Sequence, residues 1–174
     1  IKDIEEFEDK SVFYSIQDKS IFRNKNLVIA GGGDSAVDWA IELAEESKKI
    51  YFIHRRSKLR AAPNSVKKLE NLCSTGKVEM IIPYQVDSIN GKNGIIEEVI
   101  VRNLSQEIIT LKADYFLPLF GLSSDLGPIK NWELEISENS LKIDQSTCQT
   151  SKHGIFAVGD VCSYSGKLKL ILTG

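Results

Sequence analysis

Three consecutive glycines stand between an apolar run and a segment with helical spacing. The stretch reads "IAGGGDSAVDW" over residues 29–39. The residues that match the fingerprint G-x-G-x-x-A are Gly31, Gly32, Gly33, Asp34, Ser35 and Ala36. Such a turn lets a pyrophosphate approach the backbone, and the N–H groups of the following helix favour its negative charge. The motif predicts a dinucleotide site, although isolated glycines of this kind also form simple tight turns.

A basic cluster follows the next predicted strand. About 20 residues after such glycines, NAD-binding domains carry a carboxylate that binds the ribose 2′-OH. Here the corresponding stretch reads "HRRSKLR" and offers His54, Arg55, Arg56 and Arg60, with no acid among them. Guanidinium groups pair bidentately with phosphate and keep their charge, whereas a carboxylate would repel a 2′-phosphate. We interpret the cluster as a selector for NADP, although a run of charge alone is also typical of a solvated surface.

Apolar spacing predicts the elements that would hold these two motifs together. Residues 27–30 are apolar throughout, as in a parallel strand buried on both faces. The apolar positions of residues 34–48 recur at three- and four-residue intervals, which indicates a helix. Further elements are expected over residues 50–53 (strand), 63–75 (helix) and 78–82 (strand).

The rest of the chain predicts a change of architecture and then a second domain. Three β-like runs, near residues 84–90, 95–102 and 107–113, indicate an antiparallel meander, and residues 115–120 a closing strand. The fold class is therefore α/β, a Rossmann-like three-layer domain with a parallel sheet and an antiparallel meander. The expected divisions are a linker over 1–22, the nucleotide domain over 23–121, and a second domain from 122 to 174, with short strands at 141–144 and 154–160.

Composition excludes several classes of protein. The 174 residues are 42% hydrophobic and 26% charged, which suits a soluble domain, and the net charge of -2 favours neither nucleic acid nor a membrane surface as partner. No apolar run reaches the roughly 20 residues that span a bilayer and no secretory signal is visible, so a cytoplasmic location is expected. The widely spaced Cys73, Cys148 and Cys162 fit neither a disulfide framework nor a zinc site, and we expect no metal.

Three motifs together resemble the NADPH domain and returning flavin segment of thioredoxin reductases and their relatives in the pyridine nucleotide-disulfide oxidoreductase superfamily. They read "GGGDSAVDWAIELA", "HRRSKLRA" and "GIFAVGDV". In that family two Rossmann-type domains bind FAD and NADPH, and the NADPH domain is inserted into the sequence of the FAD domain. The resemblance implies that residues 1–22 end the first FAD segment and that residues 122–174 begin its incomplete return.

The resemblance also implies further cofactor-binding residues. It assigns Gly159 and Asp160 to the ribityl and pyrophosphate region of FAD, and residues 167–174 to the approach of the last flavin-side helix. Gly121, directly after the closing strand, is included among the expected binding residues. Because only one glycine fingerprint is present, the chain is expected to be an excised fragment that binds NADPH, retains little FAD and shows no steady turnover.

One departure from that family concerns its redox pair. Aligning "FRN" at residues 22–24 puts the two C-x-x-C positions at Tyr14 and Gln17, and neither side chain can form a disulfide. This loss, together with "FGLSSDLGPIKNW" and "YSGKLKLI", resembles the thioredoxin-reductase-like ferredoxin–NADP reductases of bacteria. The resemblance implies that NADPH passes a hydride to FAD, which then passes single electrons to ferredoxin or flavodoxin.

The cofactors carry this chemistry, so no catalytic side chain is assigned. The implied partners are ferredoxin or a similar electron carrier and, in the full-length protein, a second copy in a homodimer. Two alternatives stay open. One is a thioredoxin reductase with displaced redox cysteines, for which Cys148 and Cys162 are the nearby candidates. The other is a non-catalytic module that binds NADP.

Overall fold

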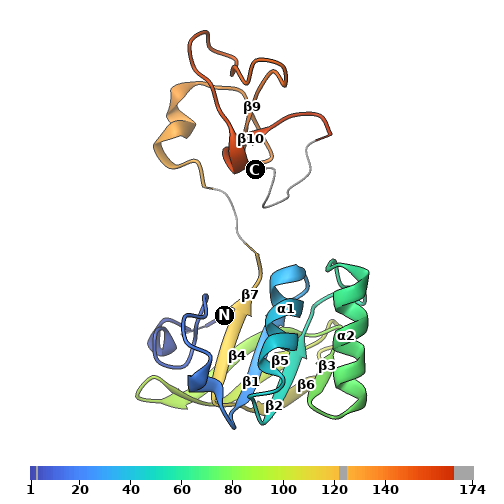
Figure 1. Ribbon diagram of the computed structural model, residues 1–174. Coiled ribbons are helices and arrows are strands. Elements are labelled where there is room, and N and C mark those ends of the chain that lie inside the picture. The colour runs from blue at the N-terminus through green and yellow to red at the C-terminus, as the bar shows by residue number, and fades with distance from the viewer. Residues whose placement is uncertain (3, 122–124, 167–174) are drawn as a thin grey trace. The chain divides into compact units, whose positions relative to one another are not determined.

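The chain divides into two compact units, each with its own hydrophobic core (Figure 1). The computed structural model describes residues 1–2, 4–121 and 125–166. The first unit is Ile1–Gly121 and the second is Leu122–Gly174. None of the helices in these described ranges has the length and apolar character that crossing a membrane requires.

A four-stranded parallel sheet with the order β3-β2-β1-β7 forms the centre of the first unit. Its strands are β1 (Asn26–Gly31), β2 (Lys49–Ile53), β3 (Val78–Ile81) and β7 (Tyr115–Leu119). In β1, Leu27 and Ile29 join one core, whereas Val28 and Ala30 join another on the opposite face. Because both faces are covered, the strand is apolar at every position from 27 to 30, as the sequence predicts.

Two helices cover one face of this sheet, α1 (Asp34–Leu43) and α2 (Pro63–Ser74) (Figure 1). α1 turns Ala36, Val37, Ala40 and Leu43 into the core, in agreement with their helical spacing. The helix ends before the predicted residue 48. Lys48 N–H donates to the Lys25 carbonyl at 2.9 Å, and this long-range bond draws the chain back to begin β2.

An antiparallel meander covers the other face and completes the predicted three layers. Its strands are β4 (Gln85–Lys92), β5 (Ile95–Arg102) and β6 (Ile108–Lys112). Val99 and Val101 of β5 pack against Val28 and Phe116 of the parallel sheet in one buried cluster. The layers are therefore helices, parallel sheet and meander, which confirms the predicted fold class.

The segment that we expected to be a linker packs onto this unit. It contains two short 3-10 turns, η1 (Ile4–Phe7) and η2 (Ser20–Phe22). Phe7 and Val12 are buried in the meander core, and Phe22 is buried in the helix-side core. The sequence did not reveal this packing, because a few widely spaced apolar residues anchor the segment without forming a helical or strand pattern.

The second unit is small and irregular. Its regular elements are η3 (Gly127–Trp132), β8 (Ile136–Ser137), β9 (Ser140–Lys142), η4 (Gly159–Val161) and β10 (Cys162–Ser163). Its buried core consists of Leu126, Leu134, Leu141, Ala157 and Cys162. The short strand predicted at 141–144 corresponds to β9. The expectation for residues 167–174 lies outside the described residues.

The predicted strand over residues 154–160 is wrong. This stretch makes one isolated bridge, between Gln149 and Phe156, and then enters η4. Phe156 and Val158 are 62% and 69% exposed. An apolar run forms a strand only where a neighbouring strand bonds along its length, and within the described residues this run gains one bridged position.

Candidate dinucleotide site

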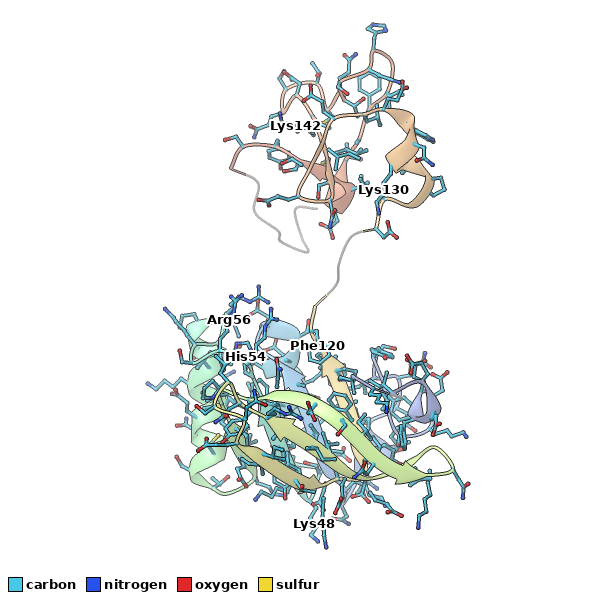
Figure 2. All side chains as sticks on the ribbon, turned by 180° about the vertical axis from the view of Figure 1, so that it is seen from behind. Lys48, His54, Arg56, Phe120, Lys130 and Lys142 are labelled. Carbon is cyan, nitrogen blue, oxygen red and sulfur yellow. The ribbon has the colours of Figure 1, made fainter. Side chains whose placement is uncertain are left out.

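The carboxyl ends of the parallel strands bring the two sequence motifs to one edge of the sheet. β1 ends at Gly31 and leads into the glycines, whereas β2 ends at Ile53 and leads into the basic cluster. Figure 2 shows His54, Arg56 and Phe120 at this edge and Lys48 at the opposite end of the unit. Open α/β sheets bind their ligands at this edge.

The three glycines have different structural roles. A Cβ on Gly31 would lie 2.4 Å from the Leu119 carbonyl oxygen and 2.6 Å from Ala36 Cβ, so this glycine allows strand and helix to pack closely. A Cβ on Gly33 would meet no atom within 4 Å. Gly33 precedes the first residue of α1 with an extended backbone, so the space beside it is open to a ligand at the helix N-terminus.

His54 occupies the place that a side chain at position 32 would need. A Cβ on Gly32 would lie 2.1 Å from His54 Cε1 and 2.4 Å from its Nδ1. The imidazole is 7% exposed, and its Nε2 is buried without a hydrogen-bond partner. The ring therefore lines the site, and its Nε2 has no hydrogen-bond partner among the residues that the structure describes.

Burial lowers the pKa of His54 below its usual value. The charges of Arg60 and Arg55 act in the same direction, whereas backbone hydrogen bonding at Lys58 and Gly31 opposes them. Since water is excluded from the ring and the neighbouring charges are positive, the folded protein favours neutral imidazole.

Hydrogen bonds attach the basic loop, which we define as residues 54–62, to the glycine turn. Arg60 N–H donates to the Gly32 carbonyl at 2.7 Å. Ala62 N–H donates to Asp34 Oδ1 at 2.8 Å. Asp34 therefore fixes the end of the basic loop, and Ser35 beside it is exposed at the start of α1.

A cavity of about 290 Å³ lies between the glycine turn and the basic loop. Its wall includes five residues predicted from the two motifs, Gly31, Gly32, His54, Arg55 and Arg60. It also includes residues that were not predicted, among them Tyr84 and Phe120. Phe120 is 58% exposed although it follows an apolar strand, and this exposure is visible only in the folded chain.

Three arginines at this edge have no carboxylate partner within the part of the chain that the structure describes. Arg23 pairs with Glu46, and Arg102 pairs with Asp87. Arg55, Arg56 and Arg60 form no ion pair with any carboxylate among the described residues. Arg56 lines a neighbouring open groove, which it shares with Arg55, Arg60 and Lys58. The arrangement leaves an excess of positive charge available to an anion.

The remaining predicted cofactor residues lie elsewhere. Gly121 is exposed at the end of the first unit, with a positive φ of 93°. Gly159 and Asp160 belong to η4 in the second unit. Their assignment to a cofactor stays a prediction.

The positions expected for a redox pair hold no thiol. Tyr14 is exposed, and its hydroxyl donates to Glu8 Oε1 at 2.7 Å, which raises the pKa of Tyr14 to about 12.

No disulfide joins the described cysteines. Burial raises the pKa of the Cys73 thiol and keeps it protonated, so it is a poor nucleophile. Within the described ranges, no group of three or more acidic, cysteine or histidine side chains could hold a metal ion.

We expect Gly32→Ala to destabilise the first unit by about 1–3 kcal/mol, because the new methyl group would displace the buried His54 ring. The matched variant is Gly33→Ala, whose methyl group would enter open space. It should change the free energy of unfolding by less than about 1 kcal/mol. Urea titration followed by circular dichroism measures both. Equal losses in the two variants would refute the role assigned to Gly32.

The lowered pKa of His54 predicts a pH-dependent stability. Below about pH 6.5 the unfolded chain takes up a proton on this histidine that the folded protein resists, so stability should fall as the pH drops. The urea midpoint measured between pH 5.5 and 7.5 should show this slope, and His54→Gln should reduce it. His153→Gln, at the exposed second histidine, is the control and should leave the slope unchanged.

Sequence comparisons agree with this geometry. Residues 1–173 match the family described as pyridine nucleotide-disulphide oxidoreductase. A relative from Rickettsia akari named ferredoxin–NADP reductase is 52% identical over 174 residues, which are 100% of this chain and 52% of the relative. A relative of the same name from Anaplasma phagocytophilum is 50% identical over 172 residues, covering 98% of this chain and 51% of its own length. The chain spans about half the length of these relatives.

Solved structures show the same fold. Thioredoxin reductase from Lactococcus lactis superposes with a TM-score of 0.86 at 26% identity, covering 98% of this chain and 55% of that one. The thioredoxin reductase of Streptococcus pyogenes is 30% identical with a TM-score of 0.66, covering 98% and 54%. The sequence match, the shared fold and the site at the sheet edge point the same way. The chain belongs to the pyridine nucleotide-disulphide oxidoreductase family.

Proposed function

We propose that this chain is the NADPH-binding part of an FAD-dependent ferredoxin–NADP reductase. The proposal rests on Arg55, Arg56 and Arg60 beside the glycine turn, which pair with no carboxylate in the described ranges. A 2′-phosphate is the feature that distinguishes NADPH from NADH, and guanidinium groups are its usual partners.

The other end of the site suits a pyrophosphate. The N-terminus of α1 supplies N–H groups and a positive dipole end, and the space beside Gly33 is open. His54 lines the same cavity as Gly31 and Gly32. The residues present therefore fit the phosphate groups of a phosphorylated dinucleotide.

The proposal assigns Gly159, Asp160 and Gly121 to cofactor contacts in the complete protein. Hydride acceptance from NADPH and one-electron transfer to ferredoxin or flavodoxin would be supplied by FAD when it is bound. This chain's residues bind and orient the dinucleotide. A homodimeric assembly in the cytoplasm belongs to the same proposal and is supported by the resemblance alone.

Two observations favour ferredoxin over a dithiol protein as acceptor. The relatives from Rickettsia akari and Anaplasma phagocytophilum, which are 52% and 50% identical to this chain, are named ferredoxin–NADP reductase. Tyr14 and Gln17 stand where the resemblance places the redox pair of thioredoxin reductases. A thioredoxin reductase with displaced cysteines would have to use Cys148 or Cys162, both of which lie in the second unit.

Replacing both Arg55 and Arg56 with Ala should raise the Kd for NADPH by roughly 100-fold, the loss of two charge-assisted phosphate contacts. The Kd for NADH should change by less than about threefold, because NADH lacks the 2′-phosphate. Isothermal titration calorimetry measures both constants. Lys48→Ala removes a charge from the opposite end of the unit and should alter neither (Figure 2). Equal losses for NADPH and NADH would show that the arginines are not the selector.

A protein that carries this chain together with a flavin-binding half should reduce ferredoxin with NADPH and should not reduce thioredoxin. The physical reason is that no thiol pair occupies positions 14 and 17. Cytochrome c reduction coupled to ferredoxin reports one activity. NADPH-dependent reduction of thioredoxin, followed by the reaction of its new thiols with Ellman's reagent, reports the other. Thioredoxin turnover would support the displaced-cysteine alternative, and absence of bound flavin would support a non-catalytic module.

A further inference from the structure

A carboxylate stands at the helix N-terminus where the proposed ligand carries its negative charge. Asp34 is the first residue of α1, and its side chain is exposed. A carboxylate at this position interacts favourably with the positive end of the helix, but it repels a phosphate that approaches the same N–H groups. The described residues that line the cavity beside the glycine turn do not include Asp34. The position of this acid therefore calls for a role other than contact with the dinucleotide.

A long-range hydrogen bond joins Asp34 to the end of the basic loop. Asp34 Oδ1 accepts a hydrogen bond from Ala62 N–H at 2.8 Å, across 28 residues of sequence. Ala62 is the N-cap of α2, and Pro63 follows it as the first helical residue. Alanine has no polar side chain with which to cap a helix. The bond from Asp34 therefore fastens the start of α2, and with it the end of the basic loop, to the start of α1.

The basic loop is held at its end and exposed before it. Residues 55–58, which include two of the arginines, are exposed. Arg60 N–H donates to the Gly32 carbonyl at 2.7 Å, and the side chain of Ala61 is buried in the helix-side core. The bond to Asp34 is the next attachment along the chain. The distance between the exposed arginines and the N-terminus of α1 therefore depends on where these three consecutive residues are held.

We infer that Asp34 is a positioning residue that makes the site selective for NADPH over NADH. The inference rests on the proposed function. By holding Ala62, Asp34 keeps the arginines at a distance from the helix N-terminus at which one dinucleotide reaches both. A loop that is already in place loses less conformational entropy when it binds the 2′-phosphate. The charge of Asp34 weakens the binding of both nucleotides, whereas its hydrogen bond favours the one that carries the 2′-phosphate.

Two substitutions separate the charge of Asp34 from its hydrogen bond. Asp34→Asn removes the charge and keeps the acceptor oxygen, whereas Asp34→Ala removes both. Each should bind NADH about threefold more tightly than the parent chain, because one repelling charge is gone. The selectivity ratio, which is the Kd for NADH divided by the Kd for NADPH, should stay within about twofold of the parent value in Asp34→Asn. It should fall by roughly three- to tenfold in Asp34→Ala, as expected for the loss of one hydrogen bond.

Two further variants control for charge and for folding. Asp38→Ala removes the same charge one turn further along α1, where the exposed Asp38 has no hydrogen bond or ion pair with the described residues. Its selectivity ratio should match that of the parent. Ala62→Pro removes the donor of the bond and leaves the charge of Asp34 in place, and the φ of -55° at this position is one that proline adopts. It should lower the ratio as Asp34→Ala does.

Calorimetry gives the ratios, and hydrogen exchange at the Ala62 amide without nucleotide reports the bond itself. Exchange should be slow in the parent and in Asp34→Asn, and faster in Asp34→Ala. Parent-like ratios in Asp34→Ala and Ala62→Pro, or exchange at Ala62 that is no faster in Asp34→Ala, would overturn the inference and leave the role of the arginines intact. A parent chain that binds NADPH no more tightly than NADH would instead overturn the proposed function.

Discussion

The glycine turn after β1 and the basic loop after β2 hold each other in place. Their contact requires glycine at position 32, because the His54 ring fills the space that a side chain there would occupy. On either side of it, Arg60 N–H bonds to the Gly32 carbonyl and Ala62 N–H bonds to Asp34. The loop is thereby attached to the glycine turn by the protein's own bonds. A ligand that bound here would lose less conformational entropy from the loop than it would with an unattached loop.

This attachment concentrates positive charge where the protein itself supplies no compensation. The chain carries a net charge of -2, yet Arg55, Arg56 and Arg60 stand together without carboxylate partners among the described residues. Like charges held close together oppose the compact state, and an anion that binds only the folded form recovers that stability. The lowered pKa of His54 fits the same arrangement, since a charged imidazole would add another cation to the cluster.

This chain shares its fold with thioredoxin reductases but has no thiol at the two positions where the resemblance places their redox pair. The superposition with the Lactococcus lactis enzyme shows a shared architecture at 26% identity. In this chain, Tyr14 bonds to Glu8 at one position expected for a redox thiol, and Gln17 occupies the other. A fold of this kind fixes where a dinucleotide can lie, but the groups beside the cofactors decide which acceptor can receive electrons from them.

The sequence by itself determined the layers of the first unit and the two motifs of its candidate site. Periodicity reveals which faces are buried, and glycines after a strand reveal a tight turn, because both depend on neighbours along the chain. The tertiary structure alone decided that His54 fills the space beside Gly32 and that α1 stops at Leu43. It also decided that Phe120 lines the cavity and Leu104 the neighbouring groove. It also left residues 154–160 without a strand. These outcomes depend on contacts between residues distant in the chain, which local spacing does not record.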